Sequence, residues 1–421
     1  MSNKKFLLAL SMSMLICAFF VGCNGERTPD QAESGERTTI TFWNGFTGPD
    51  GPVLQMLVDE FNETNENGVY IDMDIMPWDV LFQRLATVLA VQEGPDIIAF
   101  ATEHIGTYAL PGAIAPIGEI FSSGRIDSSV IPPYFYENLQ FNGQHFGVPM
   151  NFATLLLYYN KDLFEAAGLD PERPPASWDE LEDFALRIRA IENMDVYGFG
   201  LAVSQTIPMW PIMVWGGGGD FIQNGRSVLN SEANVATITR WADLIVNSNI
   251  APPIMTGAEI DSLFASGRLG MYFVGPWATT GFTEGGLNFG VAPAPAGPAG
   301  PITLATGVAM VMTSSSQNQE AVFDFFEWWN SPDTQVRWSL GTGFPLARTD
   351  VLDDPRLEEN PFIIAFSSVA NDARFHLQQL TNFSQIESEI IVPALETILL
   401  LGADVRETLD RFSADLDTLL D

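Results

Sequence analysis

Lysine is almost absent from this sequence. It occurs only at Lys4, Lys5 and Lys161, none of them in the GxxxxGK[ST] setting that a phosphate-binding loop requires, so this class of nucleotide site is excluded. Against 19 basic residues the 421-residue chain carries 53 acidic ones, which gives a formal net charge of −34. Such an excess of negative charge repels phosphate backbones, and the sequence therefore argues against nucleic-acid binding.

Residues that carry covalent and metal chemistry are also scarce. The three histidines lie far apart and form neither an HExxH nor an HxH motif, so we expect no zinc site at His104, His145 or His376. There is no GxSxG nucleophile motif, and residues 72–74 lack the glycine and the closing glutamate of a calcium loop. We expect no metal, no cofactor and no enzymatic activity. A pair of carboxylates assembled from distant positions, as in a glycoside hydrolase, stays open.

The N-terminus has the pattern of a secretory signal. A basic start and an uncharged apolar run over residues 6–21 end at Gly22 and Cys23, so we expect residues 1–22 to be a signal peptide. The junction resembles a bacterial lipobox, in which Cys23 becomes the lipidated first residue; ordinary secretory cleavage is the alternative. Residues 23–37 are polar and read as a flexible tether. Because no later stretch reaches the roughly 18 apolar residues of a membrane span, we expect membrane contact through the lipid alone, in the periplasm or on the outer face of the cell membrane.

The rest of the chain alternates strands and helices. Over residues 38–100 the periodicity predicts strand, helix, strand, helix, strand, with bounds 38–43, 53–63, 69–76, 78–93 and 96–100. This order is typical of a parallel sheet with crossover helices, and ligands of such sheets bind beyond the carboxyl ends of the strands. We therefore expect the loops that open at Trp43, Trp78 and Ala101 to face one crevice. Further helices are predicted at 178–191, 232–246, 319–329 and 384–401, a tight turn at 216–219 and a linker at 292–301.

Nine of the ten tryptophans fall into two groups. The first group lies in helical patterns, which favours core packing: Trp178, Trp241, Trp328, Trp329 and Trp338. The second lies beside Gly, Pro or Asn, at what we read as strand ends: Trp43, Trp210, Trp215 and Trp277. Flat aromatic faces on loops stack on the apolar faces of sugar rings. For each member of the second group, ligand contact and structural packing both stay open.

Seven segments, taken together and in order, resemble a known family. They are residues 40–43 (ITFW), 94–98 (GPDII), 147–149 (GVP), 157–164 (LYYNKDLF), 175–181 (PASWDEL), 275–277 (GPW) and 341–346 (GTGFPL). The set is similar to extracellular solute-binding proteins of family 1, the maltose-binding type of lipoprotein that serves ABC importers. The resemblance extends over nearly all of the chain after the signal peptide.

The resemblance implies an α/β fold of the two-lobed periplasmic-binding-protein type (type II), with the ligand cleft between the lobes. The N-terminal lobe would comprise residues 38–150 plus 304–344, and the C-terminal lobe residues 151–303 plus 345–421. The chain would cross between lobes near 149–153, 302–306 and 344–347. Solute would be held by closure about this hinge.

By the same resemblance, the ligand-binding residues come from both lobes and from one crossing. They are Trp43, Asn44, Phe46, Phe100, Glu103, His104, Asn151, Trp210, Trp215, Gly216 and Trp277. Ala153 and Ile207 replace an acid and an aromatic platform of the maltose binder, which argues against maltose itself as the solute.

The expected function is capture of a carbohydrate, a sugar or oligosaccharide, which a monomeric protein delivers to the transmembrane subunits of an ABC permease. Two alternatives stay open. A binder of glycerol phosphate or a related polyol derivative would present convergent arginines, for which Arg348 and Arg374 are candidates. Whether the residues that closure brings in include Arg348, Arg374 or Gln385 stays open. A secreted glycoside hydrolase would share the tryptophans and the acids but would turn over an oligosaccharide.

Overall fold

The computed structural model describes residues 37–420, apart from 49, 205–206 and 253–254. The expected signal peptide, Cys23 and the tether up to residue 36 lie outside the described residues. The contacts within the chain separate it into two units, residues 1–37 and residues 38–421. All helices and strands described below belong to the second unit. Within the described ranges, no helix is both long enough and apolar enough to cross a membrane.

The first sheet is built on the strand–helix alternation that the sequence predicted. Its elements are β1 (Thr38–Asn44), α1 (Asp50–Thr64), β2 (Val69–Ile75), α2 (Trp78–Val88) and β3 (Ile97–Ala101). β1 pairs in parallel with both β2 and β3, which confirms the parallel sheet with crossover helices. Ile40 and Phe42, which the alternation places on one face of β1, are fully buried. The carboxyl ends of these three strands therefore open at one edge of the sheet.

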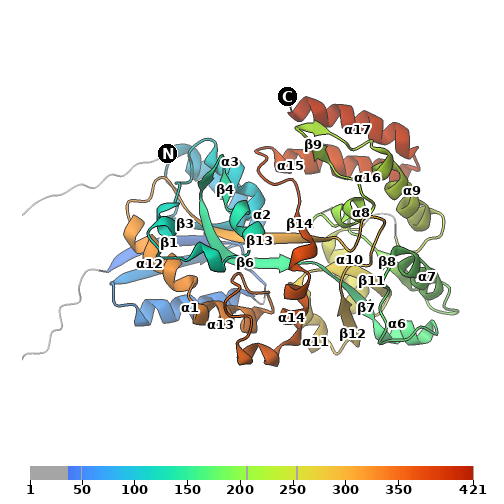
Figure 1. Cartoon of the computed structure of the whole chain (residues 1–421), viewed down its shortest axis with the longest axis horizontal. Helices are drawn as coiled ribbons and strands as arrows, with labels where there is room; N and C mark the ends of the chain where they lie inside the picture. The colour runs from blue at the N-terminus through green and yellow to red at the C-terminus, as the bar shows by residue number, and fades with distance from the viewer. Residues whose placement is uncertain (1–36, 49, 205–206, 253–254, 421) are drawn as a thin grey trace, which may run out of the picture. The chain divides into compact units, whose positions relative to one another are not determined.

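Two long strands complete this sheet. β6 (Gly147–Thr154) and β13 (Thr303–Met312) run antiparallel side by side, and β13 also pairs with β3 (Figure 1). A bulge interrupts the β6–β13 register between Val308 and Ala309. β13 extends past β3, and its residues 303–305 pair instead with β14 (Ala373–Phe375). Residues 373–375 thus belong to the first sheet, although we predicted the whole of 345–421 in the other lobe. They pair with β13 because this part of its edge has unpaired backbone groups where β3 does not reach.

The second sheet has the order β12-β7-β11-β8. Its strands are β7 (Leu156–Asn160), β8 (Tyr197–Gly200), β11 (Leu269–Val274) and β12 (Phe289–Ala292). β7 begins two residues after β6 ends, so the chain passes directly from one sheet to the other. The backbone N–H of Leu155, at this passage, donates to the carbonyl of Leu304 over 3.0 Å. Residues 293–302, which overlap the predicted linker at 292–301, lead from β12 back to β13.

Each sheet has its own core. Buried side chains change from the first core to the second between Ala153 and Leu155, and back between Leu304 and Ala305. Trp329 and Trp338 are fully buried in the first core, and Trp241 in the second, as their helical patterns predicted. These changes of core lie beside two of the expected crossings. The complete division of the chain into lobes stays a prediction.

The predicted long helices are present, with one internal difference. α7 (Trp178–Arg189), α9 (Glu232–Val246) and α12 (Gln319–Trp329) follow the prediction closely. The segment predicted as one helix over 384–401 instead comprises α15 (Phe383–Ile386), a π-helical turn η7 (Glu387–Ile391) and α16 (Val392–Leu401). Pro393 has no N–H to donate to the preceding turn, and such wider turns accommodate a break of this kind.

Trp210 and Trp215 are not at strand ends, and that prediction was wrong. Both lie in α8 (Trp210–Gly216), where Pro211 occupies the first turn, a position that tolerates its missing N–H. The predicted tight turn follows directly, with Gly218 at a φ of 85°. A short apolar run bounded by Pro and Gly does not distinguish helix from strand by itself, which is why the sequence misled us here.

Candidate ligand-binding site

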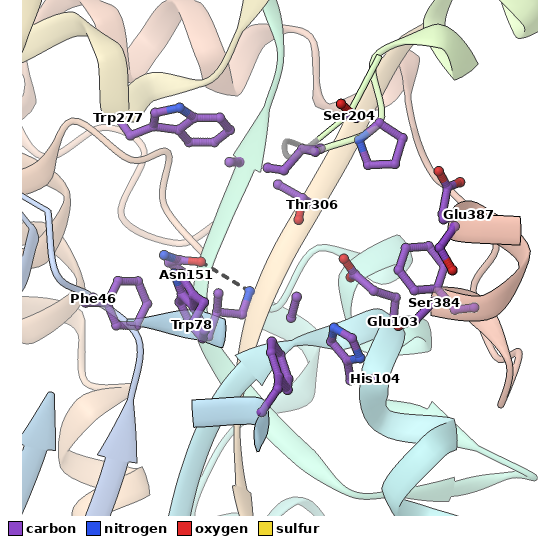
Figure 2. A pocket seen from close by; sticks show the side chains of 18 of the residues that line it. Phe46, Trp78, Glu103, His104, Asn151, Ser204, Trp277, Thr306, Ser384 and Glu387 are labelled. Atoms are coloured by element: carbon purple, nitrogen blue, oxygen red, sulfur yellow. Dashed lines mark hydrogen bonds between the residues drawn. The ribbon is translucent and has the colours of Figure 1, made fainter. Parts of the chain in front are cut away.

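A cavity of about 860 Å³ lies among loops from both sheets (Figure 2). Its apolar lining consists of Phe46, Trp78, Phe82, Ala101, Ala153, Val203, Ile207, Pro208, Trp277, Val308, Phe344, Phe383 and Val392. Its polar lining consists of Asp50, Glu103, His104, Asn151, Ser204, Thr306, Ser384, Glu387 and Ser388. Mostly apolar walls with a few polar groups are typical of small-molecule sites, and the volume suits a solute of one to a few rings.

Three parallel strands deliver side chains to this cavity from their carboxyl ends. Phe46 follows β1, Trp78 opens the helix after β2, and Ala101 ends β3. The sequence predicted that the loops after these strands face one crevice, and residues from all three line the cavity. The rule for ligand placement in parallel sheets thus holds for this fold.

The two tryptophans among the described lining residues rest directly on glycine backbones. A Cβ at Gly45 would lie 2.0 Å from the indole of Trp78, and a Cβ at Gly275 would lie 2.1 Å from the indole of Trp277. Any residue larger than glycine would displace the ring at either position. One tryptophan comes from the loops of the first sheet and the other follows β11 of the second, so each sheet contributes one indole seated in this way.

Hydrogen bonds hold the backbone under Trp277. The hydroxyl of buried Tyr158 donates to the carbonyl of Gly275 over 3.0 Å, and the hydroxyl of Thr279 donates to the carbonyl of Pro276 over 2.6 Å. Trp277 itself is half-buried, in the short helix η4 (Pro276–Ala278). Since proline also fixes the preceding backbone angle, little freedom is left for this ring to lose when a ligand binds.

The other aromatic side chains connect these two tryptophans. Phe46 contacts Trp78 and Trp338 edge-on, at centroid distances of 5.5 and 5.7 Å. Trp338 stacks on Phe344 at 6.2 Å, and Phe344 lies 6.3 Å from Trp277. A continuous chain of rings thus joins one indole to the other, and it anchors the apolar wall in the buried core through Trp338.

Asn151 is the polar group at the passage between the sheets. It is buried in β6, and its side-chain oxygen accepts a hydrogen bond from the backbone N–H of Val308 over 3.2 Å (Figure 2). Val308 lies at the bulge in β13, and bulges commonly redirect a side chain toward a site. This oxygen already accepts a hydrogen bond from the protein. The amide NH₂ of Asn151 can donate to a ligand.

The opposite end of the cavity is acidic. Glu103 and His104 lie in the short helix η2 (Thr102–His104) after β3, and Glu387 begins the π-helical turn. Burial raises the pKa of Glu103 to about 7, and the nearby charge of Glu387 adds to the rise. Burial lowers the pKa of His104 to about 4, so this imidazole is neutral at neutral pH. One oxygen of Glu387 lies 2.5 Å from Nε2 of His376.

No lysine or arginine is among the described residues that line the cavity. Arg348 is engaged elsewhere, in hydrogen bonds to Asp350 and to the carbonyl of Asn330. Arg374 is exposed on β14 and Gln385 pairs with Glu389, and neither belongs to the lining. The described part of the lining therefore offers carboxylates and neutral polar groups, and no lysine or arginine for a phosphate.

The family model of bacterial extracellular solute-binding proteins matches residues 47–336, more than half of the chain. The chain belongs to this family. Membership confirms the resemblance on which the sequence analysis relied, and it places the site of action of this solute-binding protein outside the cytoplasm.

Three comparisons illustrate the similarity. A protein of Brucella abortus (strain 2308), named only as a binding protein, is 26% identical over 402 residues, which cover 92% of this chain and 94% of that protein. The ABC transporter solute-binding protein of Thermotoga lettingae TMO, solved with alpha-D-tagatose, matches with a TM-score of 0.81 and 24% identity over 91% of this chain and 100% of its own. UgpB of Mycobacterium tuberculosis, solved with glycerophosphocholine, matches with a TM-score of 0.81 and 23% identity over 91% of this chain and 98% of its own. These matches show the two-lobed α/β fold.

Five of the site residues named from the sequence of this solute-binding protein line the cavity. They are Phe46, Glu103, His104, Asn151 and Trp277. They come from the loop after β1, the helix after β3, strand β6 and the segment after β11. Their role as ligand contacts stays a prediction, but the fold brings them to one space.

Three other named residues lie at the ends of the strands of the first sheet, outside the lining. The side-chain oxygen of Asn44 accepts from the N–H of Phe46 over 3.2 Å, so Asn44 positions a lining residue. Trp43 is half-buried, with the Arg84 guanidinium 5.7 Å from its ring. Phe100 is fully buried and packs edge-on against His104.

The three named residues of α8 serve the second core. Trp210 and Trp215 are both buried, and the indole N–H of Trp215 donates to Asp220 over 3.3 Å. A Cβ at Gly216 would lie 2.8 Å from the indole of Trp178, so that glycine permits close packing of α8. None of the three lines the cavity. The structure therefore favours the packing alternative for both tryptophans.

Sequence reasoning did not name several lining residues. Trp78 lies at the second of the three loops that we expected to face one crevice. Phe344 lies in the 341–346 segment that carries the family resemblance. Phe82, Phe383 and Glu387 carry no such signal. Each lies on a helical segment whose pattern only indicates a buried face. In the part of the chain that the structure describes, no group of three or more metal-binding side chains is found.

Proposed function

We propose that this solute-binding protein captures a carbohydrate and delivers it to an ABC importer. The observation that carries the proposal is the cavity itself, with aromatic rings from both sheets, neutral polar groups and carboxylates, and no lysine or arginine among its described lining residues. Aromatic faces bind the apolar faces of sugar rings, while amides, hydroxyls and carboxylates bind the sugar hydroxyls.

The placement of the two indoles suggests how capture works. Trp78 belongs to the loops of the first sheet and Trp277 to those of the second. A sugar that docks on one ring gains the contact with the other only when the lobes close. Contacts made only in the closed form provide the free energy that shifts the protein toward it. The closed form is then the one presented to the permease.

A binder of glycerol phosphate is the second candidate, because UgpB of Mycobacterium tuberculosis has the same fold and was solved with a phosphodiester. The charges of this cavity disfavour it. A phosphate would meet Asp50, Glu103 and Glu387 without a lysine or arginine from the described lining to neutralise it. Arg348 is held by Asp350, and Arg374 is exposed on β14.

The remaining parts of the function follow from the same proposal. We expect a monomer that is lipidated at Cys23, attached to the membrane by the lipid alone, and free of hydrolytic activity. A hydrolase would place a general acid and a second carboxylate on either side of the scissile bond. Prolonged incubation with oligosaccharides and analysis of the products tests this point, and any turnover would contradict it.

A ligand screen tests the proposal as a whole. Thermal shifts against sugars, oligosaccharides, polyols and sugar phosphates, followed by calorimetry on the hits, should give saturable binding to carbohydrates. sn-Glycerol 3-phosphate serves as the anionic comparison. Tight binding of this phosphate, with no response to any carbohydrate, would refute the proposal in favour of the second candidate.

A further inference from the structure

The chain changes core once more in its C-terminal part. Val369 packs in the second core, Phe375 at the end of β14 packs on the first core, and Leu377 packs on the second core again. β14 pairs with residues 303–305 of β13, where the buried side chains of that strand also change core. The strands β6, β13 and β14 thus lie side by side where the two cores meet. We call residues 376–382, which follow β14, the strap.

The second core holds the strap at both ends. His376 is buried, and its Nε2 lies 2.5 Å from a carboxylate oxygen of Glu387 in the π-helical turn. At the other end, the side-chain amide of Asn382 donates to the carbonyl of Leu419 in α17 (Val405–Leu420) over 2.9 Å. The buried residues of the π-helical turn and of α17 belong to the second core. A movement of the second core therefore carries the ends of the strap with it.

The middle of the strap contacts a helix that belongs to the first core. The hydroxyl of Thr107, in α3 (Ile105–Ala109) after β3, donates to the carbonyl of Thr381 over 3.0 Å. A Cβ at Gly106 would lie 3.6 Å from the carbonyl oxygen of Leu380, so the backbone of α3 lies against the strap. The buried side chain of α3 packs in the first core. The strap thus joins elements of the two cores.

Two residues of the strap have backbone angles that side chains rarely adopt. Leu377 has a φ of 47° and Gln379 a φ of 62°. In the part of the chain that the structure describes, every other residue with positive φ is glycine or asparagine, except Gln92. A bulky residue such as leucine is exceptional in this region. Such strained conformations persist only where surrounding contacts maintain them, and they gather in ligand clamps and switch regions.

We propose that the strap is a latch between the lobes, which favours the closed form before any solute is bound. The proposal rests on the proposed function and assigns a control of its lobe closure. The contact with Thr107, and the hydrogen bond that the side chain of Gln378 donates to Glu103, exist only while the lobes are close. Because solute binds the closed form, the population of that form in the free protein sets the apparent affinity for every solute alike. The strain at Leu377 and Gln379 opposes the latch and lets the lobes separate.

Thr107→Val tests the latch without altering the cavity. It removes the hydroxyl of a residue outside the lining and keeps the shape of the side chain. Calorimetry on the carbohydrates found in the screen should give affinities that all fall by the same factor, about twofold to tenfold, the value of one hydrogen bond. Small-angle scattering of the unliganded variant should give a larger radius of gyration than the wild type. Thr64→Val is the matched control, because the hydroxyl of Thr64 donates to the carbonyl of Glu60 within α1 over 2.7 Å, and it should change neither quantity.

The possible results separate the latch from the proposed function. A larger unliganded radius in Thr107→Val supports the latch even if no carbohydrate binds, a result that would count against the proposed function alone. Carbohydrate binding with wild-type affinity and radius in this variant would overturn the latch and leave the proposed function intact. A loss of affinity confined to one solute would place Thr107 in contact with that solute and also overturn the latch. An unchanged radius without any carbohydrate binding would count against both.

A pair of glutamines tests the backbone of the strap. Gln379 and Gln92, which follows η1 (Leu89–Val91) with a φ of 58°, are both exposed and outside the lining. A β-branched residue disfavours positive φ, so Gln379→Val and Gln92→Val should both lower the melting temperature. Only Gln379→Val should weaken binding, by the same factor for every solute. Gln379→Gly adopts this φ without strain and should bind at least as tightly as the wild type. Equal affinities in the two valine variants would refute the role of the strap, and if Gln379→Val fails to fold, the Thr107 variant decides.

Discussion

Trp277 is the side chain whose removal separates binding from folding most clearly. Its indole lies on Gly275, its backbone is held by Tyr158 and Thr279, and its exposed part faces the cavity. Trp277→Ala removes this surface and leaves the supporting hydrogen bonds in place, because the hydroxyls of Tyr158 and Thr279 donate to the carbonyls of residues 275 and 276 and not to Trp277. We therefore expect lost affinity in a protein that still folds.

The magnitude follows from the position of the ring. A rigid aromatic contact at the centre of a binding site is worth on the order of 2–4 kcal/mol, which corresponds to about 30-fold to nearly 1000-fold weaker binding. Truncation of a fully buried tryptophan costs roughly 3–5 kcal/mol of stability. Trp277 is only half-buried, so the free energy of unfolding should fall by less, about 1–2 kcal/mol, with a drop of a few degrees in the unliganded melting temperature.

The assay compares the unliganded melting temperature with the affinity for the best solute from the screen. Trp328→Ala is a matched control, because Trp328 is also half-buried but packs on Phe61 in the first core, outside the lining. It should lower stability and leave affinity unchanged. Gly275→Ala keeps the indole but places a Cβ 2.1 Å from it, so it should also weaken binding by displacing the ring. Unchanged affinity in a folded Trp277→Ala variant would refute the assignment of this ring to the site.

Four further predictions concern charge, packing, anchoring and motion. The pKa of Glu103 is about 7 in the folded protein and 4.5 without burial, so between these pH values the folded state binds a proton that the unfolded state has lost. The free energy of unfolding should therefore fall by up to roughly 3 kcal/mol as the pH rises from 5 to 8. Melting temperatures measured across this pH range should show a flatter profile for Glu103→Gln. Gly198→Ala places a Cβ 2.0 Å from the carbonyl oxygen of Ala185 and should destabilise the protein by about 1–3 kcal/mol in denaturant unfolding, without a direct effect on the site. Cys23→Ser should release the protein from the membrane fraction, and full retention would contradict lipid anchoring. Small-angle scattering should give a smaller radius of gyration at saturating solute, and an identical profile would argue against lobe closure.

The regular part of the fold was predictable because it depends on periodic burial. Alternation over residues 38–43 places Ile40 and Phe42 on the inward face, and both are fully buried in β1. The same applies to α9, where Thr237 and Trp241 fall on one buried face at helical spacing. Parallel connection of the first three strands then follows from the crossover helices, and it locates the cavity edge without any knowledge of side-chain contacts.

The candidate site was harder to predict, and six of the eleven named residues lie outside the lining, because neighbouring residues in the sequence serve different sides of an element. Phe46 reaches the cavity, whereas Asn44, two residues earlier, uses its side chain to hold the N–H of Phe46. Trp210 and Trp215 satisfied the same pattern as Trp277, an indole beside glycine or proline. They differ in that a helix carries them into the second core. The pattern identifies an aromatic near a turn but does not identify which way the turn faces.

Charge in the cavity depends on tertiary structure even more strongly. Glu103 and His104 are adjacent in the sequence, and ordinary pKa values would make the acid charged and the imidazole partly charged at neutral pH. Burial acts on them in opposite directions, since it raises the pKa of the acid and lowers that of the base, and both changes favour the neutral form. A third residue of the lining, Glu387, comes from a π-helical turn 284 positions after Glu103, which no sequence period indicated. The acid–base state of this end of the cavity is therefore a property of the folded structure, because burial changes both pKa values and the sequence positions of these residues do not indicate it.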